Sequence, residues 1–299
     1  MKKNIYIIEE ICDFYPEHVF ECGQCFRWNR QEDGSYTGIA GGKVVNVRFE
    51  PADMERKAGR LVLTGCREED FEGFWRHYLD LNRDYGKIKS QLGRGDKVMR
   101  KATSFGWGIR ILNQDLWETI VSFIISQNNN IPRIKGCIEK LAELYGEPVM
   151  TECESLVADC SGEANAKRWY TLPTPEKLAS LSIEDLAPVK LGYRAKYLIE
   201  AAKAVGNQGL PQNREELTGL CGVGPKVAGC IALFGMNCRD SFPIDVWVAR
   251  VMHQLYGLEE KDKAAMAAFA REKFGKLGGF AQQYLFYYMR ENFQQEILC

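Results

Sequence analysis

Short runs in which apolar and polar residues alternate fill the first part of the chain, from about residue 18 to residue 65. The runs cover residues 19–28, 35–40, 43–50 and 60–64. Asp33-Gly34 and Gly41-Gly42, which lie between runs, are hairpin signals, and such short connections join antiparallel neighbours. This part of the chain is therefore predicted to form an antiparallel sheet.

From residue 67 onward the apolar positions recur with helical spacing. Between residues 67 and 110 the repeat consists of large apolar residues that we expect in the core: Phe71, Phe74, Trp75, Tyr78 and Leu79. Beyond residue 110 the whole chain reads as helical. The prediction is an α+β protein, with an N-terminal antiparallel sheet domain over residues 1–110 and a helical domain of two lobes over residues 111–299.

Residues 217–230 predict two helices joined by a glycine hairpin. Gly222 and Gly224 flank one apolar residue, which suits a tight turn, and Pro225 can open the second helix. Lys226 then lies at a helix N-terminus, where free N–H groups disfavour the protonated amine and so favour its nucleophilic form. Asp245 precedes the next apolar segment as a helix N-cap, although its carboxylate can instead face Lys226.

Taken alone, the hairpin also allows interpretations without catalysis. It can bind a DNA phosphate through backbone N–H groups, with Lys226 as a solvated charge and Asp245 as a helix cap only. It can also be a turn that binds nothing. A nucleotide phosphate loop is disfavoured, because the Gly-x-x-x-x-Gly-Lys-Ser/Thr spacing is missing and no strand precedes the glycines.

Two further helix junctions carry polar groups. After an apolar helix predicted over residues 114–125, Asn128 and Arg133 place an amide and a guanidinium where they can reach a base edge. Tyr193 and Arg194 lie at a later junction. From the residues alone, surface packing and a solvated charge explain these last two equally simply.

Four motifs accompany the hairpin in the order of a known family: residues 22–28, 126–133, 191–197 and 281–286. With Lys226 and the Pro-Ile-Asp sequence that ends at Asp245, they resemble the helix-hairpin-helix DNA glycosylases, and among these the 8-oxoguanine DNA glycosylase/AP lyases. The resemblance implies a bifunctional enzyme of base excision repair. It would flip 8-oxoguanine out of duplex DNA, excise it through a lysine Schiff base and nick the strand by β-elimination.

The resemblance also implies a role for each matching residue. Lys226 would attack the anomeric carbon of the sugar, and Asp245 would stabilise the cationic sugar and orient the lysine. The base pocket would consist of Gly23, Cys230, Gln282 and Phe286. The DNA contacts would come from Asn128, Arg133, Tyr193, Arg194, Gly222, Gly224 and Trp247, with Tyr193 as the wedge and Asn128, Arg133 and Arg194 at the orphaned cytosine.

Gly23 offers a physical explanation of lesion recognition. 8-Oxoguanine carries a hydrogen on N7, where guanine has an acceptor, so a backbone carbonyl distinguishes the two bases. Only a residue without a side chain lets the backbone approach closely. Guanine would leave the carbonyl unsatisfied, at a cost of about 1–3 kcal/mol.

Composition limits the class of protein. The chain of 299 residues is 45% hydrophobic and 26% charged, as in globular proteins with real cores. Its net charge of −1 gives no overall sign of nucleic-acid binding, so any affinity for DNA must be local. Residues 186–250 contain eight basic and five acidic residues, which is a modest positive excess.

The cysteines argue against a disulfide framework and against a cofactor. Eleven cysteines at irregular spacing fit reduced thiols, and Cys22 and Cys25 form an isolated pair without zinc-ligand partners. Beyond Asp245 there is only Cys299, so we expect no iron–sulfur cluster and no other metal. Early charges and the lack of an apolar run of about 18 residues predict an intracellular protein without a membrane partner. The family resemblance implies a monomer.

Two residues differ from the family pattern, and two alternative functions stay open. Trp247 stands where the family has a histidine, and Phe234 where it has a methionine, so phosphate contact and pocket shape are expected to differ. A monofunctional glycosylase for alkylated bases shares the fold plan but lacks a lysine at the position of Lys226. A non-catalytic helix-hairpin-helix DNA-binding protein would need neither Asp245 nor a base pocket.

Overall fold

The computed structural model describes residues 4–53, 55, 57–151, 153, 156 and 168–298, without the side chains of residues 293–298. Five antiparallel strands form one sheet in the order β1-β5-β4-β3-β2. The strands are β1 (Ile5–Cys12), β2 (Trp28–Arg30), β3 (Tyr36–Ala40), β4 (Lys43–Asp53) and β5 (Ala58–Thr64). The predicted antiparallel sheet is confirmed.

The sheet differs from the prediction at its start. Residues 19–28 do not form a strand: the helix α1 (Pro16–Phe20) and a loop lead to the short strand β2. The strand β1, which the sequence did not predict, pairs with β5 in the register Ile7↔Val62. Residues 5–8 alternate between exposed and partly buried side chains, but all four are apolar, so the sequence lacks the apolar–polar alternation that predicts a strand.

The aromatic residues after the sheet form its core, as predicted. The segments α2 (Glu68–Asp70), η1 (Phe71–Trp75) and α3 (Arg76–Tyr78) follow one another and pack on the sheet. Trp28 stacks on Phe20 at 4.0 Å and donates a hydrogen bond of 3.0 Å to the Tyr78 hydroxyl. This core holds the loop of residues 21–27 rigidly at the edge of the helical region.

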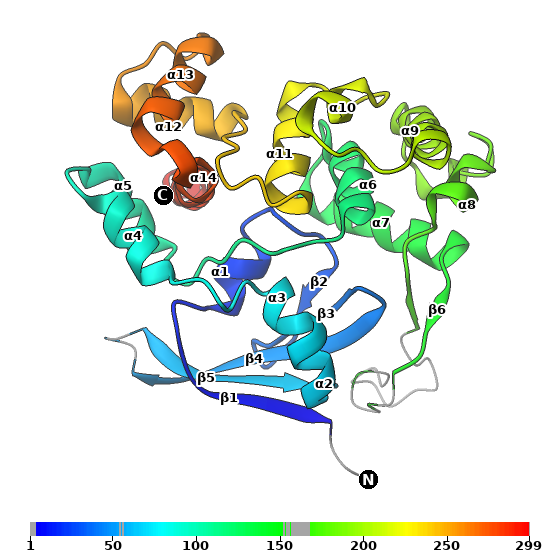
Figure 1. Cartoon of the computed structure of the whole chain (residues 1–299), viewed down its shortest axis with the longest axis horizontal. Coiled ribbons are helices and arrows are strands. Elements are labelled where there is room, and N and C mark those ends of the chain that lie inside the picture. The colour runs from blue at the N-terminus through cyan, green and yellow to red at the C-terminus, as the bar shows by residue number, and fades with distance from the viewer. Residues whose placement is uncertain are drawn as a thin grey trace.

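The remaining helices lie in two groups on one side of the sheet (Figure 1). One group contains α4 (Tyr85–Gly93), α5 (Lys97–Phe105), α12 (Val246–Tyr256), α13 (Lys263–Phe274), η4 (Gly275–Leu277) and α14 (Gly278–Leu298). The other contains α6 (Leu116–Ser126), α7 (Ile131–Tyr145), α8 (Pro175–Ala179), η3 (Ala187–Val189), α9 (Arg194–Gln208), α10 (Arg214–Gly219) and α11 (Pro225–Gly235).

The helices α4 and α5 pack in the core of the helical region, where Tyr85 meets Phe280 of α14 edge to face at 5.6 Å. These two helices precede residue 110 in the sequence but pack with the helices that follow it. The domain boundary at residue 110 therefore stays a prediction. The expectation of helix alone after residue 110 is wrong in one place. The strand β6 (Pro148–Val149) pairs with β7 (Trp169–Tyr170), and a two-residue ladder is too short to show a period.

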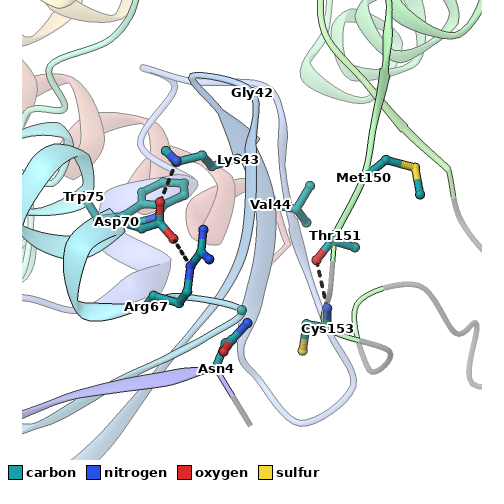
Figure 2. Close-up of a pocket in the computed structure, with 11 residues that line it drawn as sticks. Asn4, Gly42, Lys43, Val44, Arg67, Asp70, Trp75, Met150, Thr151 and Cys153 are labelled. Carbon is teal, nitrogen blue, oxygen red and sulfur yellow. Dashed lines mark hydrogen bonds and ion pairs between the residues drawn. The ribbon is translucent and has the colours of Figure 1, made fainter. Parts of the chain in front are cut away.

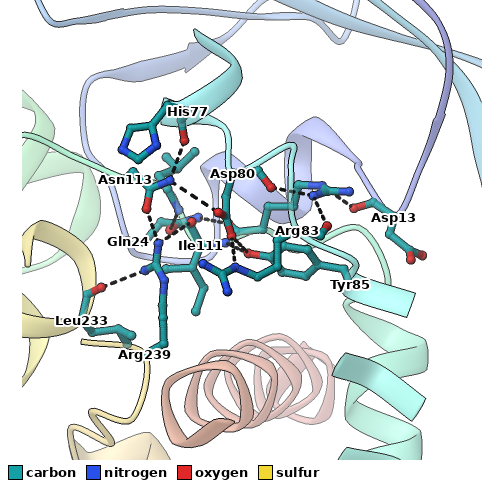
Figure 3. A network of polar contacts seen from close by, with 12 residues as sticks. Asp13, Gln24, His77, Asp80, Arg83, Tyr85, Ile111, Asn113, Leu233 and Arg239 are labelled. Atoms are coloured by element: carbon teal, nitrogen blue, oxygen red, sulfur yellow. Dashed lines mark hydrogen bonds and ion pairs between the residues drawn. The ribbon is translucent and has the colours of Figure 1, made fainter. Parts of the chain in front are cut away.

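A buried polar network joins the sheet to the helices (Figure 3). Gln24 donates to the carbonyls of Val19 and Arg110, and its side-chain oxygen accepts from Leu112 N–H at 2.9 Å. Arg239, which follows α11, donates to the carbonyl of Ile111 at 3.2 Å. The loop before β2 and the end of α11 are thus fixed to the same connecting segment.

Candidate active site

The glycine hairpin between α10 and α11 has the predicted form. Gly222 has φ +80°, and a Cβ there would lie 2.5 Å from the Tyr197 ring, so only glycine fits. Gly224 is the N-cap of α11 with φ −82°, and a Cβ there would meet none of the described atoms within 4 Å. Pro225 occupies the first turn. The backbone at Gly224 is consequently open to a ligand.

Lys226 lies in the first turn of α11 and is exposed. It borders two adjoining cavities, a narrow one of about 50 Å³ and a wider one of about 480 Å³. One turn later, Cys230 is buried in the wall of the narrow cavity. Burial raises the pKa of the Cys230 thiol, and the Lys226 ammonium opposes this only in part. The thiol therefore stays protonated and acts as an apolar wall.

Asp245 forms the predicted N-cap and also lies beside the same cavities as Lys226. As the N-cap of α12, it accepts a hydrogen bond of 2.9 Å from Val248 N–H, and it borders both cavities together with Lys226. Burial raises the pKa of its carboxyl, while the Val248 N–H and the Lys226 charge lower it. The net rise in its pKa indicates that the carboxylate is poorly solvated.

The loop between Lys226 and Asp245 is tied to its surroundings. The buried Ser241 hydroxyl donates to the carbonyl of Gly229 in α11 at 2.8 Å. Gly279 N–H at the start of α14 donates to the carbonyl of Arg239 at 2.7 Å. These bonds fix the position of α12, and with it Asp245, relative to Lys226.

Gly23 also lines both cavities. Its φ is +81°, and a Cβ there would lie 3.1 Å from the Phe286 ring. Helix α14 holds the adjoining backbone, because Gln283 donates to the carbonyl of Cys22 at 2.6 Å. Gln282 is 5% exposed, and its side-chain oxygen has no hydrogen-bond partner among the residues that the structure describes. The pocket thus presents an unpaired acceptor beside an aromatic face.

The predicted DNA contacts lie on the neighbouring surface. Asn128 is exposed with φ +44°, and Arg133 is exposed and donates to the carbonyl of Lys190 at 3.3 Å. The Tyr193 side chain is 51% exposed, as a wedge requires.

Arg194 occupies a different environment, because it is buried and donates to the carbonyls of Gln127, Asn128 and Leu191. In this geometry its guanidinium shapes the turn that displays Asn128. Its direct contact with cytosine stays a prediction.

The thiols and potential metal ligands that the structure describes form no second site. Cys22 and Cys25 are free thiols and both are buried, and burial raises the pKa of Cys22 to about 11. Within the described part of the chain, which excludes Cys299, no three His, Cys, Asp or Glu side chains gather as metal ligands. A separate polar cavity of about 170 Å³ contains the Lys43–Asp70 ion pair at 2.6 Å but none of the predicted site residues (Figure 2).

Two family models cover nearly the whole chain. Residues 7–120 match the N-terminal domain of 8-oxoguanine DNA glycosylase, and residues 121–276 match the HhH-GPD superfamily of base excision DNA repair proteins. An N-glycosylase/DNA lyase of Saccharomyces cerevisiae is 36% identical, over 80% of this chain and 67% of its own. The chain belongs to the 8-oxoguanine DNA glycosylase family.

Solved structures of this family agree closely with the fold. The 8-oxoguanine glycosylase/lyase of Clostridium acetobutylicum, in complex with double-stranded DNA containing cytosine opposite 8-oxoguanine, is 40% identical with a TM-score of 0.84. The alignment covers 98% of this chain and 99% of that one. A 3-methyladenine DNA glycosylase of Archaeoglobus fulgidus, 20% identical with a TM-score of 0.70, shares the fold alone.

Phe234 and Trp247, the two expected departures from the family pattern, both line the site. Phe234 is 3% exposed, borders the narrow cavity and stacks on Phe123 at 5.5 Å. Trp247 is half-buried and borders the wide cavity, with the Arg250 guanidinium 5.0 Å from its ring. Sequence reasoning missed Phe123 and Arg290, because each reaches the cavities through tertiary packing and lies outside any motif that predicted chemistry.

Proposed function

We propose that this chain is a bifunctional DNA glycosylase and AP lyase that excises 8-oxoguanine from double-stranded DNA. One observation carries the proposal: Lys226 and Asp245 border the same narrow cavity as Gly23, Gln282 and Phe286. A nucleophile, a carboxylate and a pocket for a flat base are thereby combined in one space.

The reaction uses the amine and the carboxylate in sequence. The Lys226 amine forms a bond to C1′ of the sugar while the bond between C1′ and the base nitrogen breaks, and the base leaves with the bonding electrons. Asp245 stabilises the positive charge that develops on the sugar. The adduct nitrogen then loses a proton, and its lone pair forms the Schiff base as the bond between C1′ and O4′ breaks and O4′ takes up a proton. Loss of a proton from C2′ finally expels the 3′ phosphate.

Recognition requires the base outside the stack, because its glycosidic bond is inaccessible in the duplex. Phe286 offers a ring for stacking, and the unpaired oxygen of Gln282 accepts from the N–H donors of the guanine Watson–Crick edge. The carbonyl of Gly23 accepts from N7–H, which undamaged guanine lacks. Cys230 closes the far side of the pocket.

The remaining predicted residues hold the DNA. Gly222 and Gly224 present backbone to a phosphate, Tyr193 fills the gap that the flipped base leaves, and Trp247 borders the entrance. The orphaned cytosine is contacted by Asn128, Arg133 and Arg194. The described residues contain no helix long and apolar enough to cross a bilayer. We further propose that the protein acts inside the cell, as a monomer.

Borohydride trapping tests the function directly. The duplexes carry 8-oxoguanine opposite cytosine, undamaged guanine or an alkylated purine. A covalent complex with the 8-oxoguanine duplex supports the proposal, since borohydride joins protein to DNA only by reducing a Schiff base between them. Release of the alkylated base without trapping would identify a monofunctional glycosylase, and release of no base would identify a DNA-binding protein.

Replacing Gly23 by alanine is expected to impair lesion recognition specifically. The added methyl group is strained at φ +81° and presses on the Phe286 ring. The excision rate of 8-oxoguanine should fall about 10- to 100-fold, as when a pocket is misaligned. Nicking of a duplex with a preformed abasic site should persist, since no base is read.

Gly34→Ala is the matched control for Gly23→Ala. Gly34 has φ +80° in a hairpin, and a Cβ there would meet none of the described atoms within 4 Å. Both substitutions should destabilise the fold by about 1–2 kcal/mol, but only the one at Gly23 should slow excision. Equal excision rates for the two variants would contradict the role of Gly23.

A further inference from the structure

Three side chains four residues apart on α14 line the site: Gln282, Phe286 and Arg290. Side chains with this spacing project from one side of a helix. At 1.5 Å per residue, Gln282 and Arg290 lie about 12 Å apart along the axis, with Phe286 midway. Gln282 and Phe286 have roles in the proposed function, but Arg290 has none.

Arg290 has one donor that the protein leaves unused. The side chain is buried, with 8% exposed; its Nε donates to Glu291 at 2.8 Å and its Nη2 donates to the carbonyl of Glu21. Nη1 is buried and has no hydrogen-bond partner among the residues that the structure describes. A buried unpaired donor destabilises the protein, and a bound acceptor would remove that cost.

The free donor lies beside Gly23 and Phe286, two residues that border both cavities. Nη1 is 3.4 Å from the position that a Cβ on Gly23 would take, and the guanidinium is 5.4 Å from the centre of the Phe286 ring. The group is positively charged, so a charge-assisted bond to an oxygen is the contact that would satisfy it best.

The order of groups along α14 indicates which oxygen this is. A purine stacked on Phe286 with its Watson–Crick edge at Gln282 directs its five-membered ring toward Arg290. In that ring N7 and C8 are neighbours. If Gly23 accepts from N7–H, the atom next to this contact is the oxygen on C8.

We propose that Arg290 Nη1 donates a hydrogen bond to the C8 oxygen of the extruded 8-oxoguanine. The inference rests on the proposed function and adds a specificity-determining residue to it. Gly23 reads the hydrogen that oxidation adds at N7, and Arg290 reads the oxygen that oxidation adds at C8. Guanine has neither group and leaves both protein groups unpaired.

The test measures binding in the Lys226→Gln background, in which the base stays attached. Arg290→Met keeps an apolar stem on Phe286 and removes the donors. The dissociation constant is measured for duplexes with 8-oxoguanine, guanine, a tetrahydrofuran abasic analogue, or 8-oxo-7-deazaguanine, which keeps the C8 oxygen but has carbon in place of N7.

The expected result depends on the C8 oxygen alone. Arg290→Met should weaken binding about 10- to 100-fold for 8-oxoguanine and by a similar factor for 8-oxo-7-deazaguanine. Affinity for guanine and for the abasic analogue should stay within about threefold, and this unchanged affinity also shows that the variant is folded. Equal weakening of all four duplexes would instead indicate a phosphate contact and overturn the proposal.

Gln283→Met is the matched control for an indirect effect through the loop. Gln283 also holds the loop before Gly23, through the carbonyl of Cys22, so its loss should weaken only the base that carries N7–H. If Arg290→Met likewise left 8-oxo-7-deazaguanine unaffected, or weakened guanine as much as 8-oxoguanine, the C8 contact would be wrong. If the protein with intact Arg290 did not prefer 8-oxoguanine to guanine, the proposed function itself would fail.

Discussion

Replacing Lys226 by glutamine is expected to abolish both excision of 8-oxoguanine and nicking of the strand. The glutamine side chain is one atom shorter but stays polar, and the lone pair of its amide nitrogen is delocalised into the carbonyl, so it does not attack C1′. Rates of both steps should fall on the order of 10⁴-fold or more, as when a nucleophile is removed from an enzyme. Single-turnover assays that resolve base release from strand cleavage measure both steps.

Binding of the lesion should survive in Lys226→Gln. Lys226 is exposed at the mouth of the two cavities, whereas the pocket residues Gln282 and Cys230 are buried behind it. Lys203→Gln is a suitable control, because it removes an exposed lysine that pairs with Glu200 and borders neither cavity. Cleavage by Lys226→Gln at the wild-type rate would rule out the Schiff-base mechanism.

Local sequence signals predicted the positions of Lys226 and Asp245 at the starts of two helices. Glycine, proline and a capping carboxylate act on their own backbone, so the hairpin at Gly222 and the cap at Asp245 could be placed from neighbouring residues alone. Helical spacing also placed Gln282 and Phe286 on one face of α14. The fold class followed from the change of period near residue 67.

The part of the site predicted to bind the base and the DNA depends on contacts that no local sequence signal encodes. Gln283 and Arg290 hold backbone that lies 261 and 269 residues earlier in the chain. Arg194 occurs in a polar, basic segment, which is typical of a surface, yet tertiary packing buries its guanidinium under the Gln127–Asn128 turn. Single-sequence patterns reveal which residue types are present at such positions but not which backbone groups they meet.

Asp245→Asn is expected to separate catalysis from stability. Asparagine caps a helix about as well as aspartate, so the bond to Val248 N–H should persist. The negative charge that stabilises the cationic sugar is lost, however, and excision should slow about 10²- to 10³-fold. Wild-type excision by this variant would limit Asp245 to a capping role.

The stability of Asp245→Asn follows from the sign of the pKa shift. Burial raises the pKa of Asp245 above its unfolded value, so ionisation of this carboxyl destabilises the folded state at neutral pH. This loss of stability appears as the pH rises above about 3.9, which is the pKa of the carboxyl in the unfolded chain. At pH 7 the variant should therefore be at least as stable as the wild type, and the difference should vanish in acid.

Asp262→Asn provides the matched comparison for Asp245→Asn. Asp262 is the exposed N-cap of α13 and accepts from Ala265 N–H at 2.8 Å, but it borders neither cavity at the site. Denaturant unfolding at pH 7 and in acid should show a pH-dependent gain for the Asp245 variant and none for the Asp262 variant. A loss of stability at pH 7 from Asp245→Asn would mean that its ion interaction with Lys226 outweighs the cost of burial. The carboxylate would then stabilise the folded protein as well as the cationic sugar in the reaction.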